Sequence, residues 1–404
     1  MMRRILFVDD EPNVLQGLKR LLRPMRREWE MTFCPSGPEA LEKLAEARFD
    51  VIVSDMQMPG MDGAELLTRV MQQHPQVVRI VLSGHSSMEA TVKSVGVAHQ
   101  FLAKPCEAET LKHTIDHAFA LRGLLSNEKL KQLVSRLESV PSLPTLYQEV
   151  IEELQHPDAS SKRVGEIVAQ DPGMTVKILQ LVNSAFFGVA RQISSAVEAA
   201  QLLGTETIKA LVLSIGVFTE FKGVAVTGID LESARKHATE TGTVAKRIAA
   251  VEKAAANVAE ACLMAGFLHD LGKLILAVNL PEQYETIMTR TKETGDSLCD
   301  VERQVLGATH AEVAAYLLGL WGIPDPIVEA AAFHHCPGQS GGRCFSPLTA
   351  VHAANVFVSE RDDAAVGGLV QKLDVDYLKQ LELADRIDLW REVGRAVLDG
   401  GDEA

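Results

Sequence analysis

The chain has 404 residues with a formal net charge of -14, and 47% of the residues are hydrophobic; this length exceeds one compact core and predicts two or three domains. Most of the negative charge follows residue 124, which argues against direct nucleic-acid binding there because acidic surfaces repel phosphate backbones. Six scattered cysteines, and no apolar stretch near the ~20 residues of a membrane span, predict a cytoplasmic protein without a membrane anchor.

Residues 1–120 alternate short apolar runs with amphipathic helical stretches. Five runs predict strands: Ile5–Val8, Met31–Cys34, Asp50–Ser54, Val77–Ser83 and His99–Lys104. The first run ends in two aspartates and is a strand rather than a signal peptide. Uninterrupted apolar strands, each followed by a helix, indicate a parallel sheet covered on both faces. We therefore predict a doubly wound, five-stranded α/β domain with functional groups at the carboxyl ends of its strands.

Chemically active side chains fall at the ends of these strands. They are Asp9 and Asp10 after the first, Asp55 after the third, Ser83 at the fourth and Lys104 at the fifth. Carboxylates that meet at one edge of a sheet offer the oxygen ligands that Mg²⁺ requires. The cation would screen the repulsion while a carboxylate attacks phosphorus, and the lysine and hydroxyl would hold phosphoryl oxygens. The pattern predicts an aspartyl-phosphate pocket.

Residues 1–120 resemble the receiver domains of response regulators. The matching text is VDDE (Val8–Glu11), DMQMPGMDG (Asp55–Gly63), LSG (Leu82–Gly84) and AKP (Ala103–Pro105). The resemblance implies that Asp55 accepts a phosphoryl group from a sensor histidine kinase or a phosphotransfer protein. The Mg²⁺ ligands that it implies are Asp10 and Asp55, Asp9 through water, and the main-chain oxygen of Gln57.

The same resemblance assigns the remaining groups of the pocket. Ser83 and Lys104 would contact the phosphoryl group, and the Lys104–Pro105 bond would be cis. Phe101 takes the place of the family's switch aromatic, which rotates inward together with the Ser83 hydroxyl. Phosphorylation is therefore expected to reshape the face of the domain near the fourth and fifth strands.

The next segment, residues 121–138, loses the strand pattern and is predicted to be a linker helix. Its apolar stripe includes Leu130 and Val134. Two interpretations stay open: a helix packed on its neighbours within the chain, or a signalling helix that pairs two protomers as a homodimer. Residues 139–404 are predicted to be all-helical, with one helix start at Asp171–Met174.

The helical part carries residues of the kinds that ligate transition metals. Neutral imidazoles and carboxylates suit Fe, Mn or Zn. Adjacent residues on a helix project about 100° apart, so a His-Asp pair could serve two neighbouring metals, which would activate water for phosphodiester hydrolysis. The candidate ligands are His237, His269, Asp270, His310, His334 and His335.

This half resembles the HD superfamily, and most closely its HDOD branch, over roughly residues 135–360. The matching text is SVPSLPTLYQEV (Ser139–Val150), IVAQDPGMTVKILQLVNSAFFG (Ile167–Gly188), AAQLLG (Ala199–Gly204), WGIPDPIVEAAAFHH (Trp321–His335) and LTAVHAANVFV (Leu348–Val358). The resemblance implies an all-α fold related to HD phosphohydrolases, in a family associated with signalling. The six candidate ligands fall where the catalytic HD branch places its own.

Two departures from the catalytic pattern argue against hydrolysis. Asn355 occupies the place of a carboxylate that normally closes the site, and CPGQSGG after the His pair differs from the DGxGYP text of the cyclic-di-GMP-cleaving HD-GYP family. Three interpretations stay open: hydrogen-bonded relics, a structural or ligand-sensing metal, and a working phosphodiesterase. Lys273 would either neutralise a phosphate or stabilise the Asp270 carboxylate.

Together these patterns predict a two-component response regulator. Phosphorylation of Asp55 would control an HDOD output domain that is non-enzymatic and acts mainly by binding a downstream signalling protein or a ligand such as a nucleotide second messenger. The alternative is a receiver-controlled, metal-dependent HD phosphohydrolase acting on a cyclic dinucleotide such as cyclic di-GMP.

Overall fold

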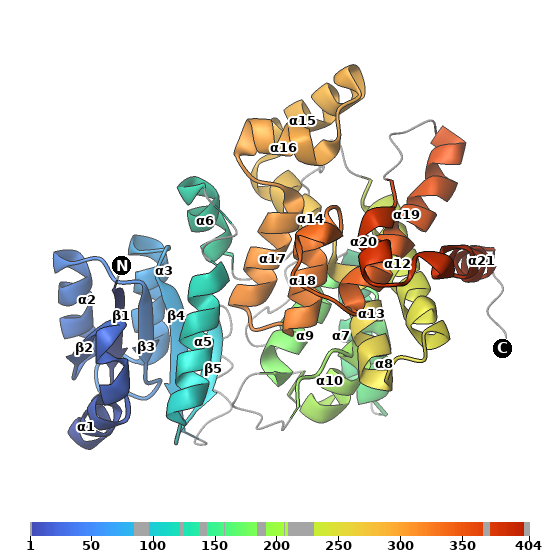
Figure 1. The fold of residues 1–404 in the computed structure, drawn as a ribbon. Helices are drawn as coiled ribbons and strands as arrows, with labels where there is room; N and C mark the ends of the chain where they lie inside the picture. Colours follow the sequence, from blue (N-terminus) through green and yellow to red (C-terminus); the bar gives the residue numbers. More distant parts are fainter. Residues whose placement is uncertain are drawn as a thin grey trace.

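The computed structural model describes residues 2–84, 97–121, 125, 127–137, 144–156, 158–183, 191–205, 207–208, 230–366 and 372–399. Its N-terminal part is an α/β domain, and a larger domain of helices lies beside it (Figure 1). Both predicted fold classes are confirmed.

Five parallel strands form the sheet of the first domain, in the order β2-β1-β3-β4-β5. Their bounds are β1 Arg3–Val8, β2 Trp29–Cys34, β3 Val51–Ser54, β4 Val78–Ser83 and β5 Gln100–Ala103. Each corresponds to a predicted strand. On β1 the side chains of Ile5, Leu6 and Phe7 are all fully buried, which is the two-sided burial that an uninterrupted apolar strand indicates.

The helices described in this domain follow the strands, and the last helix follows the last strand. They are α1 Pro12–Leu21, the short 3-10 helix η1 Arg23–Arg27, α2 Gly37–Glu46, α3 Gly63–Gln73 and α5 Ala108–Leu121. Two of them begin at side-chain caps, where Ser36 and Asp62 accept hydrogen bonds from main-chain N–H groups of α2 and α3. Such caps fix where the chain turns away from the carboxyl edge of the sheet, and so they shape the loops that line the predicted pocket.

The linker differs from the single helix expected over residues 121–138. Helix α6 spans only Glu128–Ser135, and the Asn127 side chain caps it by accepting hydrogen bonds from two main-chain N–H groups of the first turn. Leu130 and Val134 are buried, and α6 packs on a helix of the second domain. The stripe therefore favours a helix packed within the chain over one that pairs two protomers.

The second domain is built from helices throughout its described residues. Their bounds are α7 Pro144–Gln155, α8 Ser161–Val168, α9 Pro172–Val182, α10 Ala196–Leu203, α12 Leu231–Val251, α13 Ala256–Leu268, α14 Leu271–Asn279, α15 Pro281–Thr294, α16 Leu298–Leu306, α17 His310–Leu320, α18 Asp325–Phe333, η3 Pro337–Gln339, α19 Pro347–Val366, α20 Val375–Gln380, η4 Ala384–Arg386 and α21 Ile387–Leu398. The predicted helix start is confirmed, because Asp171 caps α9 through Met174 N–H.

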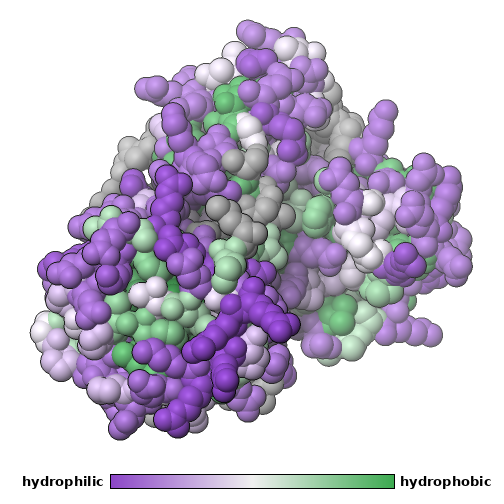
Figure 2. Space-filling model, turned by 60° about the vertical axis from the view of Figure 1, so that its left-hand side comes forward, coloured by the Kyte–Doolittle hydropathy of each residue, from purple (hydrophilic) through white to green (hydrophobic). Residues whose placement is uncertain are grey.

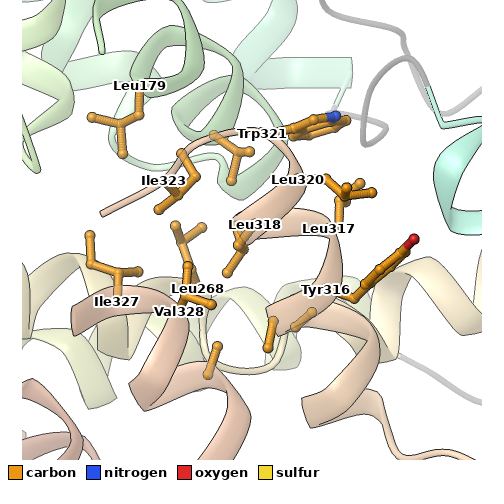
Figure 3. Packing of buried hydrophobic residues seen from close by; sticks show 14 of the residues in the cluster. Leu179, Leu268, Tyr316, Leu317, Leu318, Leu320, Trp321, Ile323, Ile327 and Val328 are labelled. Carbon is orange, nitrogen blue, oxygen red and sulfur yellow. The ribbon is translucent and has the colours of Figure 1, made fainter. Parts of the chain in front are cut away.

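Helices α9, α13, α17 and α18 share one hydrophobic core (Figure 3). Every residue of α17 except Glu312 is buried, and Figure 3 shows Leu317, Leu318 and Leu320 of α17 in the same cluster as Leu179 of α9 and Leu268 of α13. Burial on all sides explains why α17 lacks an amphipathic pattern. A buried helix has one packing solution, so its first residue, His310, is held in a fixed place.

The surface of the molecule is mainly hydrophilic on the face shown in Figure 2. Among the described residues the large hydrophobic side chains that are exposed are Met2, Leu21, Leu202 and Val375. The stretch Ala256–Asn279, which spans α13 and α14, is long and apolar enough to cross a membrane by composition alone, so the expectation that no apolar stretch approaches this length was wrong. Its apolar window is 72% buried inside the domain, as in a core helix.

A buried polar network joins the two domains at β4, β5, α6 and α17. Arg79 of β4 is only 1% exposed, and its guanidinium donates to the main-chain oxygen of Ser135 at 2.7 Å. His99 Nδ1 accepts from the Arg79 main-chain N–H at 3.1 Å, and His99 Nε2 lies 2.9 Å from the Arg79 guanidinium and 3.3 Å from the same Ser135 oxygen. The Ser135 hydroxyl lies 3.3 Å from the Tyr316 hydroxyl of α17.

Three further side chains cross the same boundary. They are Gln100, which donates to the Gly319 oxygen at 3.4 Å, Gln180, which donates to the Ala98 and His99 oxygens at 3.4 and 3.3 Å, and His117, whose Nε2 lies 3.1 Å from Asp325 Oδ1. The hydrogen bond from His117 is the main reason that the pKa of Asp325 is lowered. The receiver-like domain is thus docked on α9, α17 and α18 through β5 and α5.

Candidate functional site

The predicted pocket residues of the α/β domain meet at the carboxyl edge of the sheet. The Lys104 ammonium bridges two carboxylates, with its Nζ 2.6 Å from Asp9 Oδ2 and 2.8 Å from Asp55 Oδ1. Burial disfavours the Lys104 charge, but the hydrogen bonds to both carboxylates raise its pKa above the ordinary value. The ligand atoms of Asp9, Asp10 and Asp55 lie within 4.8 Å of one another, so these oxygens fit a hard divalent cation.

The other predicted pocket residues occupy the same edge or the neighbouring strand. Ser83 ends β4, but its side chain lies outside the described residues. Gln57 is exposed in the loop after β3, and the Lys104–Pro105 bond is cis. Phe101 of β5 is 5% exposed, so its ring is buried in this structure.

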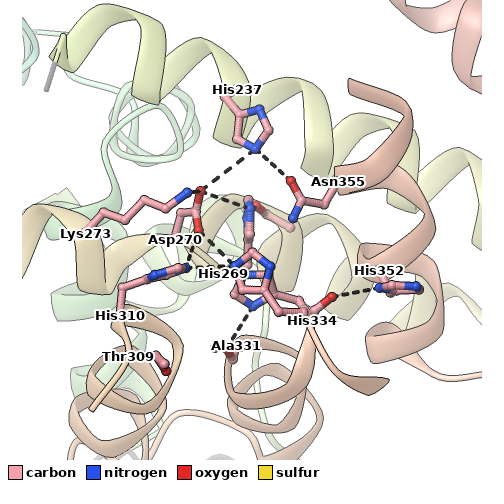
Figure 4. Close-up of polar contacts among 12 residues, drawn as sticks. His237, His269, Asp270, Lys273, Thr309, His310, Ala331, His334, His352 and Asn355 are labelled. Carbon is pink, nitrogen blue, oxygen red and sulfur yellow. Dashed lines mark hydrogen bonds and ion pairs between the residues drawn. The ribbon is translucent and has the colours of Figure 1, made fainter. Parts of the chain in front are cut away.

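The six candidate ligands of the helical domain come together from four places in the fold, and Figure 4 labels all of them except His335. His237 projects from α12, His269 and Asp270 lie between α13 and α14, His310 begins α17, and His334 and His335 follow α18. Helices α12 and α13 approach closely where glycines face each other, since a Cβ on Gly266 would lie 2.6 Å from Gly242 Cα. This contact brings the His237 helix against the His-Asp pair.

Hydrogen bonds at Nδ1 orient three of the imidazole rings. His269 Nδ1 donates to the Gly266 oxygen at 2.6 Å, and His334 Nδ1 donates to the Ala331 oxygen at 2.9 Å. His310 Nδ1 donates to a Glu302 carboxylate oxygen at 2.7 Å. These acceptors carry no proton of their own, so each neutral ring keeps its lone pair on Nε2.

Those three Nε2 atoms converge on the carboxylate of Asp270. His269 Nε2 lies 3.4 Å from Oδ2, while His310 and His334 lie 3.3 and 3.6 Å from Oδ1. Lone pairs that face carboxylate oxygens repel unless a proton or a metal ion lies between them. The donor set thus fits Fe, Mn or Zn, for which imidazole nitrogen and carboxylate oxygen are suitable ligands.

Asp270 is shared by two groups of potential ligands. One group contains Asp270, His310, His334 and His335, the other contains His237, His269 and Asp270, and the ligand atoms within each group lie within 4.8 Å of one another. The Lys273 ammonium donates to Asp270 Oδ2 at 2.5 Å, so in this structure it stabilises that carboxylate. A carboxylate common to both groups could bridge two metals.

The protonation states of the cluster suit cation binding. Burial above all lowers the pKa of His334 to about 3 and that of His237 to about 4, and it also holds the pKa of His335 well below its usual value. At His310 burial is outweighed by the Glu302 and Asp270 carboxylates, which raise the pKa to about 9. The negative electrostatic potential of these two carboxylates therefore favours a positive charge at His310, whether a proton or a metal ion carries it.

His237 stands apart from the other histidines. Its Nε2 donates to Asn355 Oδ1 at 2.9 Å and lies 3.9 Å from Asp270 Oδ2. Because that nitrogen carries the proton, it offers no lone pair in this arrangement. The Asn355 amide, which stands where a carboxylate was expected, thus accepts a hydrogen bond from the candidate ligand His237.

Sequence reasoning did not single out three buried residues. Glu302 and His352 are completely buried, and His352 donates to the His334 oxygen at 2.7 Å while accepting from Asp374 N–H at 2.9 Å. For Arg79 a signal existed, because a charged residue in the middle of the apolar run VVRIVLS needs buried partners. Glu302 sits in an amphipathic helix where a glutamate is unremarkable, so its sequence context gives no such signal.

Comparisons with known proteins identify both domains. A family profile for the response regulator receiver domain matches residues 5–116. The class defined by this fold and pocket is therefore that of response regulators, in which a receiver is joined to an output domain. A profile for the HDOD domain matches residues 140–337, and the output part of the chain belongs to the HDOD family.

Individual curated relatives match parts of the chain. The DNA-binding transcriptional regulator NtrC of Escherichia coli (strain K12) is 34% identical over 122 residues, which are 30% of this chain and 26% of NtrC. The chain spans less than half the length of the first curated relatives that it matches.

Two solved structures resemble different portions of the chain. A receiver domain of an HD domain-containing protein from Pseudomonas fluorescens Pf-5 is 30% identical and covers 30% of this chain and 98% of its own, with a TM-score of 0.29. The MmoQ response regulator of Methylococcus capsulatus str. Bath is 22% identical and covers 63% of this chain and 98% of its own, with a TM-score of 0.48.

Proposed function

We propose that phosphorylation of Asp55 by a sensor histidine kinase or a phosphotransfer protein controls the HDOD domain through the contact between the two domains. Asp9, Asp10, Asp55 and the main-chain oxygen of Gln57 hold Mg²⁺, and Ser83 and Lys104 bind the phosphoryl oxygens. The output acts mainly by binding a downstream signalling protein or a ligand in the cytoplasm.

The observation that carries this proposal is the docking of β4 and β5 on the helical domain. Ser83 ends β4 and Lys104 follows β5 directly, while Arg79 lies near the start of β4 and His99 directly precedes β5. A movement at the pocket that pulls Ser83 and Phe101 inward therefore shifts the strands that hold α6 and α17. The proposed switch loosens this contact and changes which surface of the helical domain is accessible.

Replacing Arg79 tests the contact directly. Arg79→Met is expected to weaken docking without any phosphodonor, because Ser135 loses a buried charged donor. Losing a hydrogen bond from a charged donor costs about 1.5–3 kcal/mol, which corresponds to roughly a 10- to 150-fold shift between docked and undocked forms. Hydrogen exchange of α5 and α17 in the full chain measures this shift.

The matched control is Arg48→Met, which removes an exposed arginine of the same domain. It should leave exchange in α5 and α17 at the wild-type level. Equal protection in wild type and Arg79→Met, before and after treatment with a small phosphodonor, would rule out the proposed route.

A second candidate function rests on the convergence of three Nε2 atoms on Asp270. In this candidate the HDOD domain is a metal-dependent phosphohydrolase for a cyclic dinucleotide such as cyclic di-GMP. His310, His334 and His335 would hold one metal with Asp270, and His269 belongs to the second group, with His237 and Asp270. The bound metal would supply an activated water, while Lys273 holds the charge of Asp270 in place.

Restoring the missing carboxylate tests this candidate. Asn355→Asp is expected to tighten metal binding by the group of His237, His269 and Asp270 by at least about tenfold. This is the lower end of the change in metal affinity that a hydrogen-bonding partner of a ligand causes. The added charge offsets a dication, which an amide cannot do. Metal content per chain and Zn²⁺ affinity of the full-length protein measure the effect.

Asn279→Asp serves as the control, because it makes the same change on the neighbouring helix α14, where the Asn279 amide donates to the Ile275 oxygen. The candidate loses its support if Asn355→Asp and wild type bind metal with the same stoichiometry and affinity.

A further inference from the structure

Glu302 of α16 lies beneath the histidine cluster and is not one of the candidate ligands. Its side chain is completely buried. A single oxygen, Oε2, accepts two hydrogen bonds from His310, one from the main-chain N–H at 2.9 Å and one from ring Nδ1 at 2.7 Å. One carboxylate therefore holds both the backbone and the ring of the same residue.

These two bonds fix where the His310 ring points. With Nδ1 directed at Glu302, the opposite nitrogen Nε2 lies 3.3 Å from Asp270 Oδ1 and 3.0 Å from His335 Nε2. The His310 backbone is also held from the side of α14. Gly272 packs so closely against it that an added Cβ would lie only 1.9 Å from the His310 main-chain oxygen. Helix α14 thus packs against the first turn of α17 and leaves His310 little freedom.

Helix capping alone does not explain a carboxylate at this position. Thr309 and Glu312 already form a capping box at the start of α17. A buried charge is costly unless it is paired, and a neutral side chain would cap at lower cost. Glu302 Oε1 has no hydrogen-bond partner among the described residues, so the charge finds its partner at His310 through Oε2.

A direct ligand role for Glu302 is also disfavoured by the geometry. Cys299, Glu302 and His310 lie close enough to form a ligand group of their own. In that group, however, His310 would have to bind through Nδ1, which is already donating to Glu302. The same nitrogen cannot carry a proton and bind a metal, so the ring faces the Asp270 side through Nε2.

We propose that Glu302 is a positioning residue for the metal centre of the HDOD domain, which holds the His310 ring with its Nε2 lone pair toward Asp270. This inference rests on the metal-binding candidate described above. A carboxylate behind a ligating imidazole fixes the tautomer and the ring orientation and makes the ring a stronger ligand. Glu302 thereby acts on the metal without touching it.

The test compares Glu302→Gln with Glu312→Gln in the full-length, chelator-stripped protein. Zn²⁺ is titrated in competition with a chromogenic chelator. Glu302→Gln keeps the shape but removes the charge, and it is expected to weaken Zn²⁺ binding by roughly 10- to 100-fold. Glu312→Gln changes a glutamate at the same helix start that does not touch the His310 ring, and it should bind Zn²⁺ like wild type.

A spectroscopic readout separates positioning from a general loss of structure. In ¹⁵N-histidine-labelled wild type, the His310 Nδ1 proton should give a downfield, slowly exchanging signal, because the ring is fully buried and donates to a carboxylate. That signal should be lost or moved in Glu302→Gln and kept in Glu312→Gln.

The outcomes distinguish this inference from the candidate function on which it rests. Wild-type protein that takes up no Zn²⁺ would remove the metal-dependent candidate itself. Wild type and Glu302→Gln with equal Zn²⁺ affinity, or a wild-type spectrum without the protected His310 proton, would overturn the role of Glu302 alone.

Discussion

Asp55→Ala is expected to abolish phosphoryl incorporation from a small phosphodonor and the accompanying change in domain docking. Asp55 ends β3 beside Asp9, and Lys104 contacts both carboxylates. Removing the acceptor leaves Lys104 paired with Asp9 but leaves no carboxylate at the position where phosphorus is attacked. The change is measured by intact-protein mass and by hydrogen exchange of α5 and α17, with and without the phosphodonor and Mg²⁺.

Asp62→Asn is the matched control for this experiment. Asp62 lies in the same loop but caps α3, and an asparagine caps nearly as well as an aspartate. The control should be phosphorylated and should undock like wild type. Phosphoryl uptake by Asp55→Ala would place the acceptor elsewhere, and undocking of Asp55→Ala on treatment would disconnect phosphorylation of Asp55 from the domain contact.

Asp270→Asn is expected to empty the metal centre. Asp270 belongs to both ligand groups, and three imidazole Nε2 atoms lie within 3.3–3.6 Å of its carboxylate. The loss of this one carboxylate should weaken metal binding by more than the roughly 10- to 100-fold that outer partners contribute. The measurement is metal content of protein purified without chelators and under low oxygen, which preserves ferrous iron.

Asp300→Asn controls for the removal of a charge from the same domain. Asp300 is exposed on α16 and accepts from the Ser297 hydroxyl at 2.6 Å. The Asp300→Asn variant should keep the wild-type metal content. Metal retained by Asp270→Asn would refute the arrangement described here, and wild type purified without metal would leave the histidines as a buried hydrogen-bonded cluster.

The receiver could be predicted in detail because its signals are local. Each apolar run became a strand within one to two residues of its expected bounds, for example Gln100–Ala103 where His99–Lys104 was expected. Parallel strands place their carboxyl ends at one edge, so Asp9, Asp55 and Lys104 had to meet there. The side chain of Ser83 lies outside the described residues. Most of the apolar run IKALVLSIGVF (Ile208–Phe218), whose spacing is typical of a buried helix, lies outside them as well.

The linker and the domain contact were less predictable. The helix expected over residues 121–138 is interrupted at Asn127. The Asn127 side chain caps a new helix there, and this local hydrogen bonding outweighs the helical spacing of the leucines. Which faces of two domains meet depends on contacts between residues far apart in the chain. Arg79 and Ser135 are one such pair, and neither periodicity nor propensity reports on it.

The histidine cluster shows the same limit within one domain. Sequence reasoning named the six ligand candidates, but their distances depend on close helix packing such as that at Gly242 and Gly266. The orientation of each ring depends on its Nδ1 partner, which is a main-chain oxygen for His269 and His334. Such partners have no sequence signature, because any residue supplies a main-chain oxygen.

The hydrogen-bond acceptors at the domain boundary determine how easily the equilibrium between docked and undocked domains shifts. Arg79, Gln100 and Gln180 all donate to main-chain oxygens, which water can solvate when the domains part. A neutral bond of this kind is worth about 1 kcal/mol net, and one from a charged donor such as Arg79 about 1.5–3 kcal/mol. Moving a two-state population from 1:99 to 99:1 takes about 5.5 kcal/mol, so losing a handful of these bonds together is enough. In the proposed switch, a boundary built from exchangeable polar contacts is one that a single phosphoryl group would be able to shift for the whole population of the protein.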